Sequence, residues 1–132
     1  MTRYAHATYA TAEDERAAAM SDIEREFETY WRLFAPGAPQ PEHDVEFCPD
    51  RRWRADFMWQ EYGVIVECEG GVYTGQAHGS VSGILRDIEK YNAANSLGYR
   101  VFRYGPKQRE DPQRFAKKVL VALARQRRVE TI

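Results

Sequence analysis

The chain contains 132 residues with a mass of 15.3 kDa, which predicts a single domain over residues 1–132. Apolar residues make up 43% of the chain and aromatic residues 13%, so the composition supplies a hydrophobic core and excludes a disordered protein. The sequence has no apolar run approaching the roughly 20 residues of a membrane span, and its N-terminal segment lacks the apolar centre of a secretory signal. We therefore expect a cytoplasmic protein.

Charge is distributed unevenly along the chain, although the net charge is only -1. Residues 1–50 carry 11 acidic and 4 basic side chains, whereas residues 51–132 carry 9 acidic and 15 basic ones. Residues 100–132 alone hold 10 Arg or Lys against 3 acids. Such a basic segment is compatible with a polyanionic partner, although a solvated helix face is its usual cause.

The cysteines limit the choice of metal. Cys48 and Cys68 are too few for a disulfide framework and do not form a CxxC pair. A structural zinc site is therefore not expected, and any bound metal should be held by oxygen atoms.

The hydrophobic pattern predicts seven elements in the order helix, three strands, helix, strand, helix. Thr11 is able to cap the first helix, prolines end it, and a glycine-rich loop over residues 70–83 precedes the second helix. This order predicts an α/β domain with a four-stranded mixed sheet flanked by helices, the last of them C-terminal. The helices are expected at residues 12–34, 84–97 and 112–128, and the strands at residues 45–48, 53–59, 64–69 and 99–104.

Three carboxylates occur in the second and third predicted strands. Because side chains alternate across a strand, Glu67 and Glu69 lie on one face, and Asp56 lies opposite the apolar side chains of its own strand. Antiparallel pairing around Gly63 would make Asp56 and Glu67 neighbours. Two carboxylates 5 Å apart repel by roughly 3 kcal/mol, and a divalent cation removes that repulsion. The pattern therefore predicts a Mg²⁺ or Mn²⁺ site formed by Asp56, Glu67 and Glu69.

A structural interpretation of the same strand is equally open. If the strand lies at a sheet edge, Glu67 and Glu69 point into solvent and pair with Arg54 or Lys90. The segment that follows favours the chemical interpretation, because His78 is followed by a helix that carries Asp87 and Lys90 on one face. Charges of both signs then converge near one end of the strand.

The run RADF…VIVECEGG…H…RDIEKYNAANSLGYRVFRY lies within residues 20–105. It resembles the PD-(D/E)XK nuclease superfamily, and within it the compact branch of very-short-patch repair endonucleases and Holliday-junction resolvases. The resemblance implies a restriction-endonuclease-like αβββαβ core, with Asp56 as the metal-binding aspartate and Glu67 as the first acid of the (D/E)XK element. Glu69 stands where many members have lysine, and the resemblance implies that Lys90 supplies the missing lysine from the following helix, with Asp87 fixing it.

The resemblance also implies two further site residues. Glu24 is the closest match to a glutamate that approaches the site from the first helix of the resolvases, with Glu26 and Glu28 as rivals. His78 stands where the repair endonucleases have a histidine after a glycine-rich turn. It would act as a general acid or contact phosphate, whereas a lone loop histidine is more often exposed and without a function.

Four residues are expected to contact nucleic acid directly. Tyr73 in the glycine-rich loop is placed to stack on a base. A cluster of arginines precedes the strand that carries Asp56 and would contact backbone phosphates, which makes binding strongly dependent on salt. These residues are Arg51, Arg52 and Arg54.

These features predict a Mg²⁺-dependent DNA endonuclease that hydrolyses phosphodiester bonds, with Lys90 stabilising the developing negative charge. The domain is small and symmetric cleavage needs two sites, so we expect a homodimer that resolves branched DNA during recombination or repair in a bacterial or phage-infected cell. Three alternatives stay open. They are an endonuclease that nicks at a mismatch or lesion, a catalytically inactive nuclease-fold module that binds DNA, and an enzyme acting on RNA.

Overall fold

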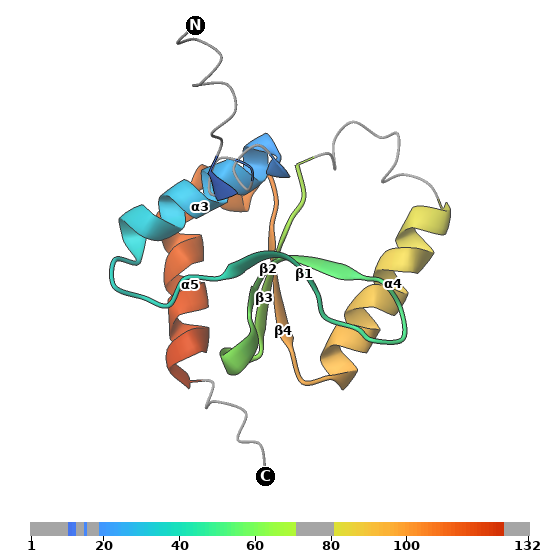
Figure 1. The fold of residues 1–132 in the computed structure, drawn as a ribbon. Coiled ribbons are helices and arrows are strands. Elements are labelled where there is room, and N and C mark those ends of the chain that lie inside the picture. Colours follow the sequence, from blue (N-terminus) through green and yellow to red (C-terminus); the bar gives the residue numbers. More distant parts are fainter. Residues whose placement is uncertain (1–10, 13–14, 16–18, 71–80, 126–132) are drawn as a thin grey trace, which may run out of the picture.

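The computed structural model describes residues 11–12, 15, 19–70 and 81–125. Its four strands form one mixed sheet in the order β1-β2-β3-β4, in which β1, β2 and β3 are antiparallel and β4 runs parallel to β3. Helices α3 and α5 cover one face of the sheet and α4 covers the other (Figure 1). The predicted α/β class, mixed sheet and C-terminal helix are therefore confirmed. The elements are α3 (Asp22–Phe34), β1 (Glu42–Glu46), β2 (Arg54–Trp59), β3 (Val64–Cys68), α4 (Val81–Ser96), β4 (Arg100–Tyr104) and α5 (Pro112–Arg125), with short 3-10 turns η1 (Gln60–Tyr62) and η2 (Gln108–Glu110).

The larger hydrophobic core lies between the sheet and the helices α3 and α5. The ring of Phe27 lies 5.0 Å from that of Phe57, 5.5 Å from that of Tyr104 and 5.9 Å from that of Phe115, measured between centroids. Burying each of these side chains stabilises the fold by about 2 kcal/mol. Because Phe57 faces this core, alternation turns its neighbour Asp56 toward the opposite face of the sheet.

The smaller core lies between the sheet and α4. Ala94 is the one buried residue of α4, and it belongs to the same cluster as Met58 of β2 and Ile65 of β3. Helix α4 therefore lies over the face of β2 and β3 that carries Asp56 and Glu67.

The helix predicted over residues 12–34 is interrupted at residues 20–21, although residues 12, 15 and 19 are also helical, and its longer part is α3. The N-cap of α3 is Ser21, whose Oγ accepts the N–H of Glu24, while Oε1 of Glu24 accepts the N–H of Ser21 at 2.8 Å. This capping box satisfies two backbone donors that the first turn of a helix leaves without partners. Ser21, and not Thr11, therefore caps α3. The C=O of Thr11 accepts the N–H of Glu15 at 3.0 Å and residue 12 is helical, which agrees with Thr11 preceding a helical turn of its own.

Replacing Ser21 with alanine should lower the free energy of unfolding by about 1 kcal/mol, because the N–H of Glu24 loses its acceptor. Urea denaturation measures this change. Ser21→Asp is the matched control, since aspartate accepts the same hydrogen bond and should leave stability nearly unchanged. Equal losses in both variants would contradict a role for the cap.

Strand β1 begins and ends earlier than predicted. It covers Glu42–Glu46 instead of residues 45–48 and pairs with β2 so that His43 faces Phe57 and Val45 faces Ala55. β1 is an edge strand, and edge strands commonly carry charged side chains. It therefore lacks the apolar alternation that identifies a strand in sequence.

Candidate functional site

Two carboxylates meet across the central antiparallel pair. Phe57 of β2 faces Val66 of β3, a register that places Asp56 opposite Glu67, as the sequence predicts. The N–H of Asp56 donates to Oε2 of Glu67 at 2.8 Å, and the N–H of Cys68 donates to Oδ2 of Asp56 at 2.7 Å. Each carboxylate is thus fixed by the backbone of the other strand.

Lys90 joins this pair from α4. Its position is one helical turn before Ala94, so it lies on the side of α4 that packs against the sheet. Its Nζ forms an ion pair and hydrogen bond with Oε1 of Glu67. Glu67 is only 4% exposed and is the one buried charged residue in the described part of the chain. Lys90 therefore compensates a carboxylate that would otherwise be strongly unfavourable in this position.

Replacing Lys90 with methionine should lower the free energy of unfolding by about 2 kcal/mol, because it leaves the Glu67 carboxylate buried without a cation. This expected loss is at the low end for a buried ion pair because the Lys90 side chain is partly exposed. Thermal or urea denaturation at neutral pH measures it. The double variant Lys90→Met/Glu67→Gln removes both charges and should recover most of the loss. A double variant that is less stable than Lys90→Met would show that the ion pair is not the cause.

Asp56 carries the clearest electrostatic perturbation of the site. Burial, followed by repulsion from Glu67, raises its pKa to about 7, although the N–H of Cys68 and the charge of Lys90 act in the opposite direction. One lysine therefore does not offset the negative charge that two ionised carboxylates would place here. The pair of carboxylates formed by Asp56 and Glu67 therefore has an affinity for a proton or for an added cation.

Glu69 is bound differently from the other two acids. Its Oε1 is paired with the guanidinium of Arg103 and accepts the hydroxyl of Tyr91 at 3.2 Å. The guanidinium of Arg103 also lies 4.8 Å from the ring centroid of Tyr91. The charge of Glu69 is thus already compensated within the protein.

The expected convergence of three carboxylates is corrected to a pair. Within residues 19–70 and 81–125, no three His, Cys, Asp or Glu side chains are grouped so that they could hold a metal ion. Asp56 and Glu67 come together, whereas Glu69 is turned to Arg103. The sequence pattern placed Glu67 and Glu69 correctly on one face and offered Lys90 as a partner, but it did not indicate that Arg103 would pair with Glu69.

These groups line a cavity of about 420 Å³ between the sheet and α4. Its volume corresponds to about 14 water molecules, enough for a phosphodiester group with bound solvent. The acids lie on the sheet side, and Asp87 and Lys90 enter from α4, as the sequence predicts. The half-exposed side chains of Ile84 and Ile88 give the α4 wall an apolar surface.

Glu24 does not line this cavity. Besides capping α3, its Oε2 lies 3.2 Å from Nε2 of His43, and these interactions lower its pKa despite partial burial. Its charge still contributes to raising the pKa of Asp56. The two rivals are also in ion pairs, Glu26 with Arg109 and Glu28 with Arg32. The structure therefore gives these three acids structural contacts outside the cavity.

The arginines proposed to contact DNA lie outside the cavity as well. Arg54 pairs with Asp44 at 2.6 Å, and Arg52 is exposed. Arg51 lies 3.7 Å from Glu89 and its guanidinium is 5.1 Å from the ring centroid of Trp53. His78 and Tyr73 fall outside the described residues.

Two polar residues of the cavity were missed in the sequence, besides the apolar Ile84 and Ile88. Tyr91 follows Lys90 directly, and Arg103 faces Glu67 in the parallel register of β3 and β4. Alternation along β4 places Arg103 on the same face as Val101, which belongs to the α4 core. That signal was present, but using it requires knowing that β4 is the neighbour of β3.

Comparisons with known protein families, characterised proteins and solved structures found no match to this chain. Among the described helices, none has the length and apolar character needed to cross a membrane.

Proposed function

We propose that the chain is a metal-dependent DNA endonuclease with a restriction-endonuclease-like fold. The observation that carries this proposal is the group formed by Asp56, Glu67 and Lys90. Two carboxylates from adjacent strands meet in a cavity and a lysine from the next helix binds one of them. The pKa of Asp56 is raised to about 7, and strongly perturbed pKa values of groups in a cleft are typical of functional sites. The resemblance of the surrounding sequence to PD-(D/E)XK nucleases supports the same conclusion.

The residues present fit a divalent cation. Asp56 and Glu67 offer hard oxygen donors, and the raised pKa of Asp56 reflects negative charge that a cation would neutralise. Mg²⁺ or Mn²⁺ would be held by these two carboxylates, with water completing the shell, whereas Glu69 stays with Arg103. When bound, the ion would polarise the phosphodiester and favour ionisation of a water molecule.

The chain's own residues would then position the reactants for hydrolysis. Water adds to phosphorus, the bond from phosphorus to the 3′ oxygen breaks, and the product carries a 5′ phosphate. The ammonium of Lys90 lies beside Glu67 and would stabilise the negative charge that develops on the phosphate oxygens. The backbone donors at Asp56 and Cys68 keep both carboxylates oriented during the reaction.

We further propose that the substrate is a branched or damaged duplex and that the active form is a homodimer. Resolving a four-way junction requires two symmetric cuts, and a two-fold dimer provides two equivalent sites. The apolar wall formed by Ile84 and Ile88 would contact sugar groups beside the scissile phosphate.

The experiment that tests the proposal incubates the purified protein with supercoiled plasmid, linear duplex and a four-way junction. Each is assayed with Mg²⁺, with Mn²⁺ and with EDTA, and an RNA duplex is included for comparison. Metal-dependent cleavage of DNA supports the proposal. Binding without cleavage under all conditions would indicate an inactive module with a nuclease fold, and selective cleavage of RNA would change the substrate class.

A further inference from the structure

Helix α5 lies on the face of the sheet opposite α4 and the candidate site (Figure 1). A band of cationic side chains comes from α5 and the edge strand β4. It lines a groove of about 460 Å³ whose lining contains no carboxylate. We call these side chains the α5 track. The track consists of Arg100, Arg114, Lys117, Lys118 and Arg125.

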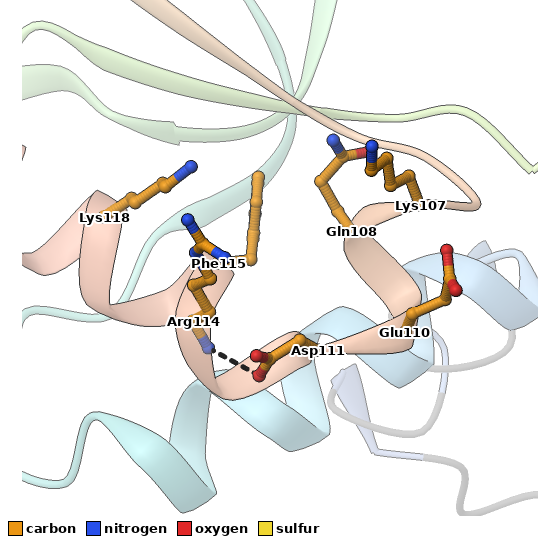
Figure 2. Close-up of a pocket in the computed structure, with 7 residues that line it drawn as sticks. All are labelled: Lys107, Gln108, Glu110, Asp111, Arg114, Phe115 and Lys118. Atoms are coloured by element: carbon orange, nitrogen blue, oxygen red, sulfur yellow. Dashed lines mark hydrogen bonds between the residues drawn. The ribbon is translucent and has the colours of Figure 1, made fainter.

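The groove continues into a second hollow where α5 begins. Arg114 and Lys118 line both, and the second hollow, of about 410 Å³, adds Lys107 from the turn before η2. Figure 2 shows Arg114 and Lys118 reaching into this hollow from α5 and Lys107 from the other side. Two acids also line it, Glu110 and Asp111, and Asp111 uses Oδ1 to accept the N–H of Arg114 at 3.1 Å. The groove is therefore strongly positive, and the second hollow has a small excess of positive charge.

These cations differ from most other arginines in the described part of the chain, although Arg52 and Arg86 also lack an ion pair there. Arg25, Arg32, Arg54, Arg103 and Arg109 each form an ion pair with a carboxylate. Within residues 19–70 and 81–125, the three track residues Arg114, Lys117 and Lys118 form no ion pair. A set of convergent cations without internal partners favours an external polyanion.

The shape of the track favours nucleic acid over an anionic membrane. From Arg114 to Arg125 the helix covers about 16 Å, the axial length of about five base pairs. A membrane-bound helix needs an exposed face of large apolar side chains, but the apolar face of α5 is buried against the sheet. Its one large exposed apolar residue within the described chain is Val121. Phe102, partly buried in the groove, has the guanidinium of Arg100 5.7 Å from its ring centroid.

We infer that the α5 track is a second nucleic-acid contact surface, which binds the phosphate backbone on the face of the sheet away from the Asp56–Glu67 cavity. This role does not depend on catalysis. In an endonuclease the α5 track would hold a duplex segment other than the one being cut. A branched substrate has such additional duplex arms.

The test compares two double variants with equal loss of charge, Lys117→Gln/Lys118→Gln on the track and Arg25→Gln/Arg32→Gln on α3. Binding of a short fluorescein-labelled DNA duplex is followed by anisotropy in EDTA, between about 50 and 200 mM salt. EDTA prevents metal-dependent cleavage, so failure of the proposed catalysis would not affect this readout. Circular dichroism establishes that both variants are folded.

The track variant should bind at least about tenfold more weakly than wild type, and the slope of log affinity against log salt should fall by about 2. The α3 variant should resemble wild type. Equal effects of the two variants, or no effect of either, would overturn the inference. Binding to phosphatidylserine vesicles in preference to duplex, lost in the track variant, would overturn it in favour of a membrane surface.

Discussion

A protein in which Glu67 is replaced by glutamine should bind DNA but cleave it at least about 10³-fold more slowly than wild type. Glutamine keeps an oxygen that can accept the N–H of Asp56, so the local geometry is retained. It removes the negative charge that would hold the cation and leaves Lys90 without its partner. Single-turnover cleavage of a labelled duplex or junction with saturating Mg²⁺ measures the loss.

Glu69→Gln is the matched control for this prediction. Glu69 lies on the same strand face and lines the same cavity, but its charge is compensated by Arg103. We expect its rate to change by less than about tenfold, whereas Glu67→Gln is nearly inactive. Equal losses in the two variants would restore the three-carboxylate site expected from sequence. Full activity of Glu67→Gln would end the proposed mechanism.

Replacing Asp56 with asparagine should stabilise the metal-free protein at pH 8 by about 2 to 4 kcal/mol while it abolishes cleavage. The pKa of Asp56 is raised to about 7 in the folded state from an ordinary value of 3.8. Between these values the folded state holds a proton that the unfolded state has released. Stability therefore decreases as pH rises from about 4 to about 7, and it changes little beyond. Asparagine is neutral throughout and still offers an oxygen to the N–H of Cys68.

Urea denaturation of both proteins in EDTA from pH 4 to pH 8 measures this difference, since groups distant from Asp56 titrate equally in the two. The variants should be about equally stable near pH 4 and diverge as pH rises. Asp44→Asn is the control, because Asp44 is exposed and paired with Arg54 and should show no such divergence. An Asp56→Asn protein that is less stable than wild type at pH 8 would show that the carboxylate is stabilised in its charged form.

Mg²⁺ should remove the advantage of the asparagine variant. A cation that binds only the folded wild type adds stability, about 2.7 kcal/mol when its concentration is 100 times the dissociation constant. Asp56→Asn should gain much less. Identical shifts in both proteins would place the cation elsewhere.

Sequence reasoning worked best where the signal is local. Alternation along β2 and β3 and the turn at Gly63, whose φ is +64°, predicted that Asp56 and Glu67 are neighbours. It was weaker at the first helix, where the capping box at Ser21 starts a new helix inside the predicted one, and at β1, where an edge strand lacks apolar alternation.

The sequence by itself determined the order of elements, the α/β class and the faces on which the acids lie, because these depend on periodicity and on short-range turns. The tertiary structure decided which cation each acid meets. Lys90 reaches Glu67 over 23 positions and Arg103 reaches Glu69 over 34, and such distant pairings depend on how α4 and β4 pack. The tertiary structure also decided how deeply Asp56 is buried. Its pKa is raised only because α4 and the sheet enclose it beside Glu67.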